Sequence, residues 1–397
     1  MTGALHGLKI LDFTTLYPGP LATVMLADLG AEVLRVEAMD RPDLLRYMPP
    51  YDSDGEGAAY RLINRNKRSI AINLKSPQAP ELLQQLVQKY DIVVEQFRPG
   101  VLDRLGVGYE ALREAQPRLI WCAITGYGQT GPYRDRPGHD INYLASSGVA
   151  SHTGREPQGP VPSNILLGDV GGGTFGAVTG ILAAVIQRQR TGRGQFVDIA
   201  MADGALWLNA LATSAVLAGD SDVGRGDAPL NGGSAYDYYQ TRDGHWLAVG
   251  ALEPKFWRDF CATLGHPELE NADTESPEAL ATLKAAIASA LATRDLADWQ
   301  PLFDAAQCCV DPVLTTREAL AHPQFAARQM IVQVPLPSGK MQSQVASPIH
   351  LSDSPSQYRH VAAQSGEHTL QVLRECGLDA AEIAELIRSS TVSNPQD

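Results

Sequence analysis

The sequence contains few cysteines, and none of them form a recognisable pair. Its five cysteines are scattered over 397 residues, with no Cys-x-x-Cys motif and no histidine cluster at metal-ligand spacing. A disulfide-rich secreted fold and a zinc site are therefore not indicated, and we predict no metal site. Free cysteines are typical of a reducing compartment, so we expect a cytoplasmic protein.

Long apolar runs and an excess of positive charge are also missing. No window approaches 18 uncharged apolar residues, and the N-terminus lacks the charged and apolar segments of a signal peptide. The formal net charge of −13 argues against general binding to nucleic acid or to a membrane surface. With 44% apolar and 19% charged residues, the composition is that of a folded, soluble enzyme without nucleic-acid or membrane partners.

Strand and helix patterns alternate through the first half of the chain. Such alternation predicts an α/β fold with a mostly parallel sheet of Rossmann type. The predicted strands are residues 8–13, 32–37, 69–74, 91–97, 119–125 and 195–199, and the predicted helices are residues 20–29, 78–89, 174–190 and 201–217. No Gly-x-Gly-x-x-Gly follows the first strand, so a nicotinamide dinucleotide site is unsupported.

A second, smaller α+β unit follows a linker rich in Gly, Asp and Pro. Asp243-Gly244 is a turn signal between two alternating strands, and helical patterns follow it. We therefore predict a large Rossmann-like domain over residues 1–200, completed by residues 331–397; a linker helix and loop over residues 201–233; and a small α+β domain over residues 234–330. We expect residues 389–397 to be a disordered polar tail.

Two polar motifs supply the groups needed to move a proton on and off carbon. His139 is followed by Asp140, which could orient its ring, and histidine is the usual general acid or base near neutral pH. Asp169 precedes three glycines and a helix that it could simply cap. Capping does not require three glycines, so we favour a functional carboxylate, kept ionised by the helix dipole, beside glycines that let a substrate carbonyl approach backbone donors.

Other charged residues have weaker signals. Glu253 precedes a proline that could open a helix, so a capping or surface role is its simplest interpretation. Basic residues gather at the ends of predicted strands, where open α/β sheets bind ligands, and there they could hold phosphates. These residues are Arg61, Arg65, Lys67, Arg68, Lys75, Arg98 and Arg104.

Over nearly its whole length, the sequence resembles the family III CoA-transferase and α-methylacyl-CoA racemase superfamily. The resemblance lies in residues 8–13 with Gly19-Pro20, and in residues 27–33, 66–69, 97–100, 191–195 and 311–314. The stretch 138–144 around His139, and Glu253 before its proline, resemble the racemase branch. The long segment 47–63 is more similar to the transferase branch, and Asn231 stands where racemases commonly have Asp. Both features weigh against the racemase branch.

The resemblance implies roles for the polar residues. In the racemase branch, His139 and Asp169 would exchange protons on opposite faces of an enolate, with Glu253 supporting the histidine. This predicts a racemase or epimerase of 2-methylacyl-CoA thioesters, with a role in lipid metabolism. In the transferase branch, Asp169 would be the nucleophile that forms a mixed anhydride, so an acyl-CoA:carboxylate CoA-transferase is the alternative. A CoA-binding protein without catalysis is a third hypothesis. The sequence does not identify the acyl group of the substrate.

The resemblance also implies contacts to coenzyme A, which would enter as part of the substrate and not as a separate cofactor. The residues expected to hold it are Arg41, Ala71, Ile72, Asn73, Leu74, Lys75, Phe97, Arg98, Arg104, Asp140 and Tyr143. Two copies of the chain would interlock like chain links into a homodimer. The active site would then lie between the large domain of one subunit and the small domain of the other, so that Glu253 would serve its partner's site.

Overall fold

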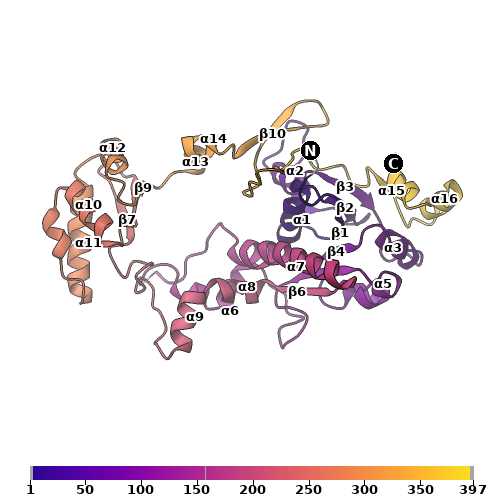
Figure 1. The fold of residues 1–397 in the computed structure, drawn as a ribbon, viewed down its shortest axis with the longest axis horizontal. Coiled ribbons are helices and arrows are strands. Elements are labelled where there is room, and N and C mark those ends of the chain that lie inside the picture. The colour runs from indigo at the N-terminus through magenta and orange to yellow at the C-terminus, as the bar shows by residue number, and fades with distance from the viewer. Residues whose placement is uncertain (1–2, 157, 394–397) are drawn as a thin grey trace. The chain divides into compact units, whose positions relative to one another are not determined.

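The computed structural model describes residues 3–156 and 158–393, and the chain forms two compact units (Figure 1). The first unit contains the chain up to Ser147, Ser163–Ala210 and the chain from Ala326 on. The second contains Gly148–Pro162 and Leu211–Phe325. We placed the boundaries elsewhere: the predicted linker is divided between the units, and Gly148–Pro162 groups with the second unit although the chain returns to the first after it.

A six-stranded, wholly parallel sheet is the centre of the first unit. Its strand order, β3-β2-β1-β4-β5-β6, is that of a doubly wound Rossmann sheet. The strands are β1 (Lys9–Asp12), β2 (Glu32–Glu37), β3 (Lys67–Ala71), β4 (Ile92–Glu95), β5 (Ile120–Thr125) and β6 (Phe196–Ala200). Because helices cover both faces, most strand residues are buried and read as apolar runs. The predicted α/β class is confirmed.

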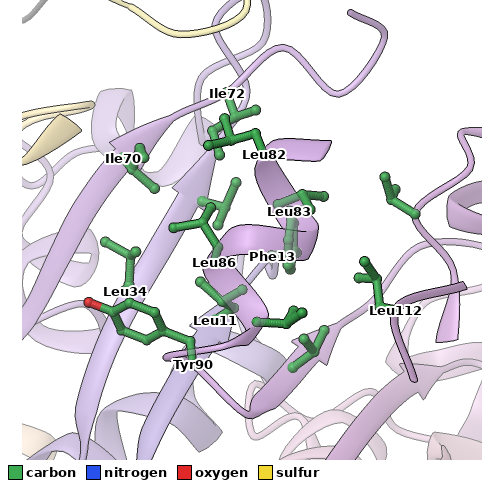
Figure 2. Packing of buried hydrophobic residues seen from close by; sticks show 14 of the residues in the cluster. Leu11, Phe13, Leu34, Ile70, Ile72, Leu82, Leu83, Leu86, Tyr90 and Leu112 are labelled. Atoms are coloured by element: carbon green, nitrogen blue, oxygen red, sulfur yellow. The ribbon is translucent and has the colours of Figure 1, made fainter. Parts of the chain in front are cut away.

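Two apolar clusters attach helices to the faces of this sheet. Leu11 belongs to one cluster and its neighbour Ile10 to the other, as the two-residue period of a strand requires. In the first cluster, Leu82 and Leu86 of α3 pack with strand residues such as Leu11 (Figure 2). The second includes residues of α1 and α7, among them Ile181. The helices named here are α1 (Pro18–Asp28), α3 (Ala79–Val87) and α7 (Phe175–Thr191).

Shorter elements complete the first unit. Besides the sheet it has an antiparallel hairpin of β10 (Ile331–Pro335) and β11 (Met341–Val345). The remaining helical elements are η1 (Leu44–Tyr47), α2 (Ala58–Ile63), α4 (Val101–Arg104), α5 (Tyr109–Ala115), α6 (Asp140–Ser146), η3 (Gly168–Thr174), α8 (Met201–Leu208), α15 (Thr369–Glu375) and α16 (Ala380–Arg388).

One long apolar helix lies in this unit. Gly168–Thr191, which joins η3 to α7, is long and apolar enough to cross a membrane by length and composition, with a mean hydropathy of 1.5 over its best window. Our search for uncharged runs did not find it. It is weak evidence for a membrane span, because a core helix meets the same criteria: 44% of the window is buried, and Ala177, Ile181 and Val185 belong to the second apolar cluster.

The end of the described chain is ordered, contrary to our prediction for residues 389–397. Thr391 and Val392 are buried, and Val392 forms an antiparallel bridge with Ile72. The Asn73 backbone N–H donates to the Thr391 carbonyl at 2.8 Å. Residues 389–393 therefore lie along the end of β3, because their backbone groups replace a missing strand partner there. Residues 394–397 lie outside the described part of the chain.

The second unit is built on a small antiparallel sheet, with Phe260, Ile287 and Trp299 in its buried core. The predicted turn at Asp243-Gly244 joins its first two strands, and Gly244 has a φ of 83°. The strands are β7 (Asp237–Gln240), β8 (Trp246–Val249) and β9 (Val310–Pro312). The helical elements are η2 (Val149–His152), α9 (Ala210–Leu217), α10 (Pro254–Leu264), η4 (Pro267–Asn271), α11 (Pro277–Leu291), α12 (Leu296–Ala306), α13 (Thr316–Ala321) and α14 (Pro323–Ala327).

Contacts over a long sequence separation explain why Gly148–Pro162 joins the second unit. The Arg155 guanidinium lies 2.7 Å from a carboxylate oxygen of Asp237. Asn231 donates its side-chain N–H to the His152 carbonyl at 2.6 Å and accepts from Arg155 at 3.1 Å. Asn231, which we singled out because racemases commonly have Asp there, is thus part of the contact that holds this loop.

Candidate active site

His139 stands immediately before α6, at the N-cap position. Its backbone N–H donates to the side-chain oxygen of Asn142 at 3.0 Å, and its carbonyl accepts from the Asn142 backbone N–H at 2.8 Å. These reciprocal bonds fix the backbone of His139 at the helix start. The residue itself is exposed, so its imidazole is accessible to a substrate.

Asp169 lies in η3, a π-helical turn that leads directly into α7. Its backbone N–H donates to Oδ1 of Asp140, the first residue of α6, at 2.9 Å. This bond brings the two predicted proton carriers, His139 and Asp169, to the same place in the first unit. π-Helical turns within longer helices are frequent at functional sites.

The Asp169 carboxyl titrates close to neutral pH. Burial and the negative charge of Asp140 raise its pKa to about 6, while the His139 ring acts in the opposite direction. We predicted a carboxylate kept ionised by the helix dipole; a pKa of about 6 leaves it mostly ionised at neutral pH but makes the protonated form accessible. A group with a pKa near the working pH is suited to both giving and taking a proton.

The three glycines after Asp169 have a different role from the one we predicted. A Cβ on Gly172 would lie 2.7 Å from the Met201 carbonyl oxygen, and one on Gly204 would lie 2.1 Å from the Gly172 Cα. A Cβ on Gly171 would lie 2.5 Å from Leu208. The run therefore allows η3 to pack closely against α8, which accounts for these glycines without a substrate.

Asp140 and Tyr143, expected among the CoA contacts, are both buried. The bond that Asp140 accepts comes from the Asp169 backbone, so its carboxyl is turned toward η3. The Tyr143 hydroxyl donates to the Gly138 carbonyl at 2.6 Å, and its ring meets that of Tyr127 edge-on, with centroids 5.4 Å apart. Both side chains thus support the loop and helix that present His139.

Glu253, the third predicted catalytic residue, belongs to the second unit. It is the exposed N-cap residue of α10, and its side chain forms no capping hydrogen bond. The capping role that we considered simplest is therefore not adopted by the side chain. Its support of a histidine stays a prediction.

The predicted CoA segment, residues 71–75, is only partly accessible. Ala71 and Ile72 are buried, and Asn73 and Leu74 are partly buried. Lys75 is exposed and its ammonium lies 3.2 Å from a carboxylate oxygen of Asp40. The exposed Arg41 follows this aspartate. Both cations follow the carboxyl ends of strands, the edge at which open α/β sheets bind ligands.

A further group of cations follows β4. Arg98 and Arg104 are exposed, and Phe97 is partly buried. A Cβ on Gly100 would lie 3.3 Å from a guanidinium nitrogen of Arg104 and 3.5 Å from one of Arg134, so both guanidiniums lie beside this glycine. Two guanidiniums at one backbone position can hold a phosphate group. Arg134 was missed because only its place in the fold, not its motif, connects it with this group.

Other basic residues do not form a phosphate site. Arg61, Arg65 and Lys67 are 1–2% exposed. They pair with buried carboxylates, at 2.9 Å for Arg61 with Asp52, 2.6 Å for Arg65 with Asp28 and 3.0 Å for Lys67 with Asp12. Arg68 is partly buried and pairs with Glu32 and Glu375. Our prediction was wrong for these four, because carboxylates neutralise them, and for all except Arg61 these carboxylates are remote in sequence.

The described part of the chain contains no group of three or more His, Cys, Asp or Glu side chains that could hold a metal ion. The arrangement in the first unit therefore consists of an imidazole, a carboxyl that titrates near neutral pH, and exposed arginines beyond the sheet edge. These residues define the candidate active site of an α/β enzyme.

Comparison with known proteins specifies the family. The model of CoA-transferase family III matches residues 5–369, and the chain belongs to this family. The alpha-methylacyl-CoA racemase of Mus musculus is 36% identical over 388 residues, which cover 96% of each chain. The succinate–glutarate CoA-transferase of Agrobacterium fabrum is 34% identical over 396 residues, covering 94% of this chain and 95% of that protein.

A solved structure agrees with this assignment. The crystal structure of a CAIB/BAIF family protein from Brucella suis matches with a TM-score of 0.82 and 28% identity, over 95% of this chain and 100% of that chain. The chain is thus an enzyme of family III, which includes relatives named for racemisation and relatives named for CoA transfer at similar identity.

Proposed function

We propose that the protein is a racemase or epimerase of 2-methylacyl-CoA thioesters that acts by 1,1-proton transfer. The observation that carries the proposal is the placement of Asp169, with a pKa raised to about 6, within electrostatic reach of His139. Inversion at an α-carbon needs one proton carrier on each face, and each carrier must work in both directions. Similarity to a racemase along 96% of the chain supports the same activity.

In the proposed reaction one of the two residues removes the α-proton. The C–H bond breaks, its electron pair moves toward the thioester oxygen to form an enolate, and the other residue delivers a proton to the opposite face. His139 and Asp169 then differ in protonation from the starting state, and either proton exchange with solvent or turnover of the opposite enantiomer restores them. The exposed Arg98 and Arg104 and the partly buried Arg134 would hold the phosphates of coenzyme A, which keeps the α-carbon between the two carriers.

The test is incubation with one enantiomer of a 2-methylacyl-CoA in deuterated water. NMR at the α-position should show deuterium uptake together with loss of optical purity. Asp169→Asn should slow both by about 100-fold or more, since a positioned acid or base contributes at least that much. Asp203→Asn, the same change at an exposed carboxyl of α8, should leave both rates unchanged. Unaltered exchange in Asp169→Asn would refute the proposed mechanism.

CoA transfer is the second candidate. It is favoured by the relatives named CoA-transferases and by the carboxyl of Asp169, which can act as a nucleophile. In that reaction a carboxylate oxygen of Asp169 attacks the thioester carbonyl. The C–S bond breaks, CoA leaves as the thiolate, and the acyl group remains bonded to Asp169 as a mixed anhydride. Transfer of CoA from the acyl donor to a free carboxylic acid would establish this function, and failure across a broad panel of acids would count against it.

A further inference from the structure

We propose, on the basis of the proposed function, that Asp140 is a positioning residue that holds the Asp169 backbone against α6 and tunes the neighbouring carboxyl through its own charge. Asp140 is 6% exposed, so little of its surface is open to a substrate. Its position next to His139 in the sequence suggested that it orients the imidazole. Its contacts in the structure point to Asp169 instead.

The first observation is a hydrogen bond between two separate elements. Oδ1 of Asp140, at the start of α6, accepts the Asp169 N–H at 2.9 Å. An N–H in the first turn of a helix has no partner within that helix and must find one elsewhere. Asp140 supplies this partner, so the bond sets where η3 begins relative to α6.

The second observation is the fit around this bond. Gly168 is buried, and a Cβ on it would lie 3.1 Å from Oδ1 of Asp140 and 3.4 Å from the Cβ of Tyr143. A Cβ at position 168 would lie closer to Asp140 than most Cβ contacts allow, so its neighbours would have to shift by a few tenths of an ångström. The Asp140 carboxyl therefore approaches η3 closely because Gly168, on η3, has no side chain at that point.

The third observation is electrostatic. Asp140 raises the pKa of Asp169, and His139 lowers it. The other elements packed on η3 carry Asp28 on α1, Asp203 on α8 and Asp198 on β6, and none of these contributes. Among the residues that the structure describes, Asp140 is thus the one carboxylate that acts on Asp169, and Tyr143 of α6 is a further titratable group that interacts with it.

These observations give Asp140 a role in the proposed reaction. A two-way proton carrier must be present in both protonation states during turnover, and a carboxyl in ordinary surroundings is almost fully ionised at neutral pH. The negative charge of Asp140 increases the protonated fraction of Asp169, while its hydrogen bond keeps the carboxyl beside α6. Neither effect requires Asp140 to touch the substrate.

Asp140→Asn is the direct test, because it keeps the side-chain shape and the accepting oxygen but removes the charge. We expect the acidic limb of the pH profile of kcat for α-proton exchange to move to lower pH by roughly one unit, the lower end of the effect of a close like charge. Asp140→Ala also removes the hydrogen bond, so its kcat should fall further, by about 10-fold relative to Asp140→Asn. Asp203→Asn is the control and should not move the profile.

A further measurement distinguishes a failure of the role proposed for Asp140 from a failure of the proposed racemase function. NMR titration of the Asp169 carboxyl carbon without substrate, assigned through Asp169→Asn, should show a lower pKa in folded Asp140→Asn than in the wild type. That shift supports the tuning role even if the wild type catalyses no exchange, in which case the proposed function alone fails. An unchanged titration in Asp140→Asn, or equal activity in Asp140→Asn and Asp140→Ala, would overturn the role of Asp140.

Discussion

Glu95 is a buried carboxyl at the carboxyl end of β4, 7% exposed. Burial and the charges of Asp103 and Asp198 raise its pKa to about 7, against the hydrogen bond that it accepts from the Phe97 N–H at 2.7 Å. Because the folded state favours the protonated form, this group contributes most to stability below the pKa of the unfolded chain. The contribution is lost as the pH rises from about 4.5 to about 7.

Glu95→Gln should remove this pH dependence, since an amide keeps the accepting oxygen and cannot ionise. We expect the free energy of unfolding of the variant, relative to the wild type, to rise by about 3 kcal/mol between roughly pH 4 and pH 8. Denaturant unfolding at several pH values measures this difference. A difference that stays constant with pH would show that Glu95 has no raised pKa in the folded protein.

Lys67 illustrates a charge whose role depends on its partner. Lys67→Met should destabilise the fold by about 3–5 kcal/mol, because it leaves the buried Asp12 carboxylate without its counter-ion. Arg113→Met, which removes an exposed ion pair with Glu110, should change stability by less than about 1 kcal/mol and serves as the control. Equal effects of the two substitutions in urea unfolding would contradict this interpretation.

At the scale of the secondary-structure elements, the contact of η3 with α8 connects the packing of the fold with the position of Asp169. Gly172 and Gly204 meet where the two helices approach most closely, and Asp169 lies three residues before Gly172 in the same turn. A displacement of η3 would therefore also move the carboxyl. Catalytic groups must be held to a fraction of an ångström, so this packing bears on activity as well as on stability.

Gly204→Ala should destabilise the protein by about 1–3 kcal/mol and reduce α-proton exchange, since its Cβ would meet the backbone of Gly172. Gly192→Ala is the matched control: its Cβ would meet nothing within 4 Å, and its left-handed φ of 74° costs about 1 kcal/mol. We expect Gly192→Ala to retain full activity when folded. Thermal unfolding and the exchange assay distinguish the two variants. A fully active Gly204→Ala would contradict the dependence of the Asp169 position on the packing of η3 against α8.

The strands and most helices could be predicted because each depends on residues close in sequence. Apolar runs such as Ile92–Glu95 identify buried parallel strands directly. The contacts that define the site depend on distant residues. Neither the bond between Asp140 and the Asp169 N–H nor the pairing of Arg65 with Asp28 has a local signal, and the glycine run after Asp169 was misread because its partner, Gly204, lies in another helix.

For the whole molecule, the exposed apolar surface of the single chain supports the predicted homodimer. Trp207 and Leu208 of α8 are 80% and 54% exposed, and Leu211 and Leu217 of α9 are 79% and 88% exposed. Soluble proteins rarely leave so many large apolar side chains in contact with water unless a partner covers them. We therefore propose that a second copy of the chain covers α8 and α9.

Sedimentation velocity tests this assembly. The wild type should sediment as a dimer, whereas the double variant Leu211→Glu, Leu217→Glu should sediment largely as a monomer, because a carboxylate would be buried without a partner at each position. Leu320→Glu, at a 47% exposed leucine of α13, is the control and should remain dimeric. A monomeric wild type, or a double variant as dimeric as the control, would contradict the proposal.

Proton transfer between two faces of one carbon is tested most directly by comparing both enantiomers of a 2-methylacyl-CoA in deuterated water. Wild-type protein should label and invert either enantiomer at the α-carbon. In His139→Gln, inversion should slow by about 100-fold or more, whereas labelling should persist for one enantiomer only, the one whose α-proton faces Asp169. Inversion of both enantiomers by His139→Gln at the wild-type rate would contradict the two-residue mechanism.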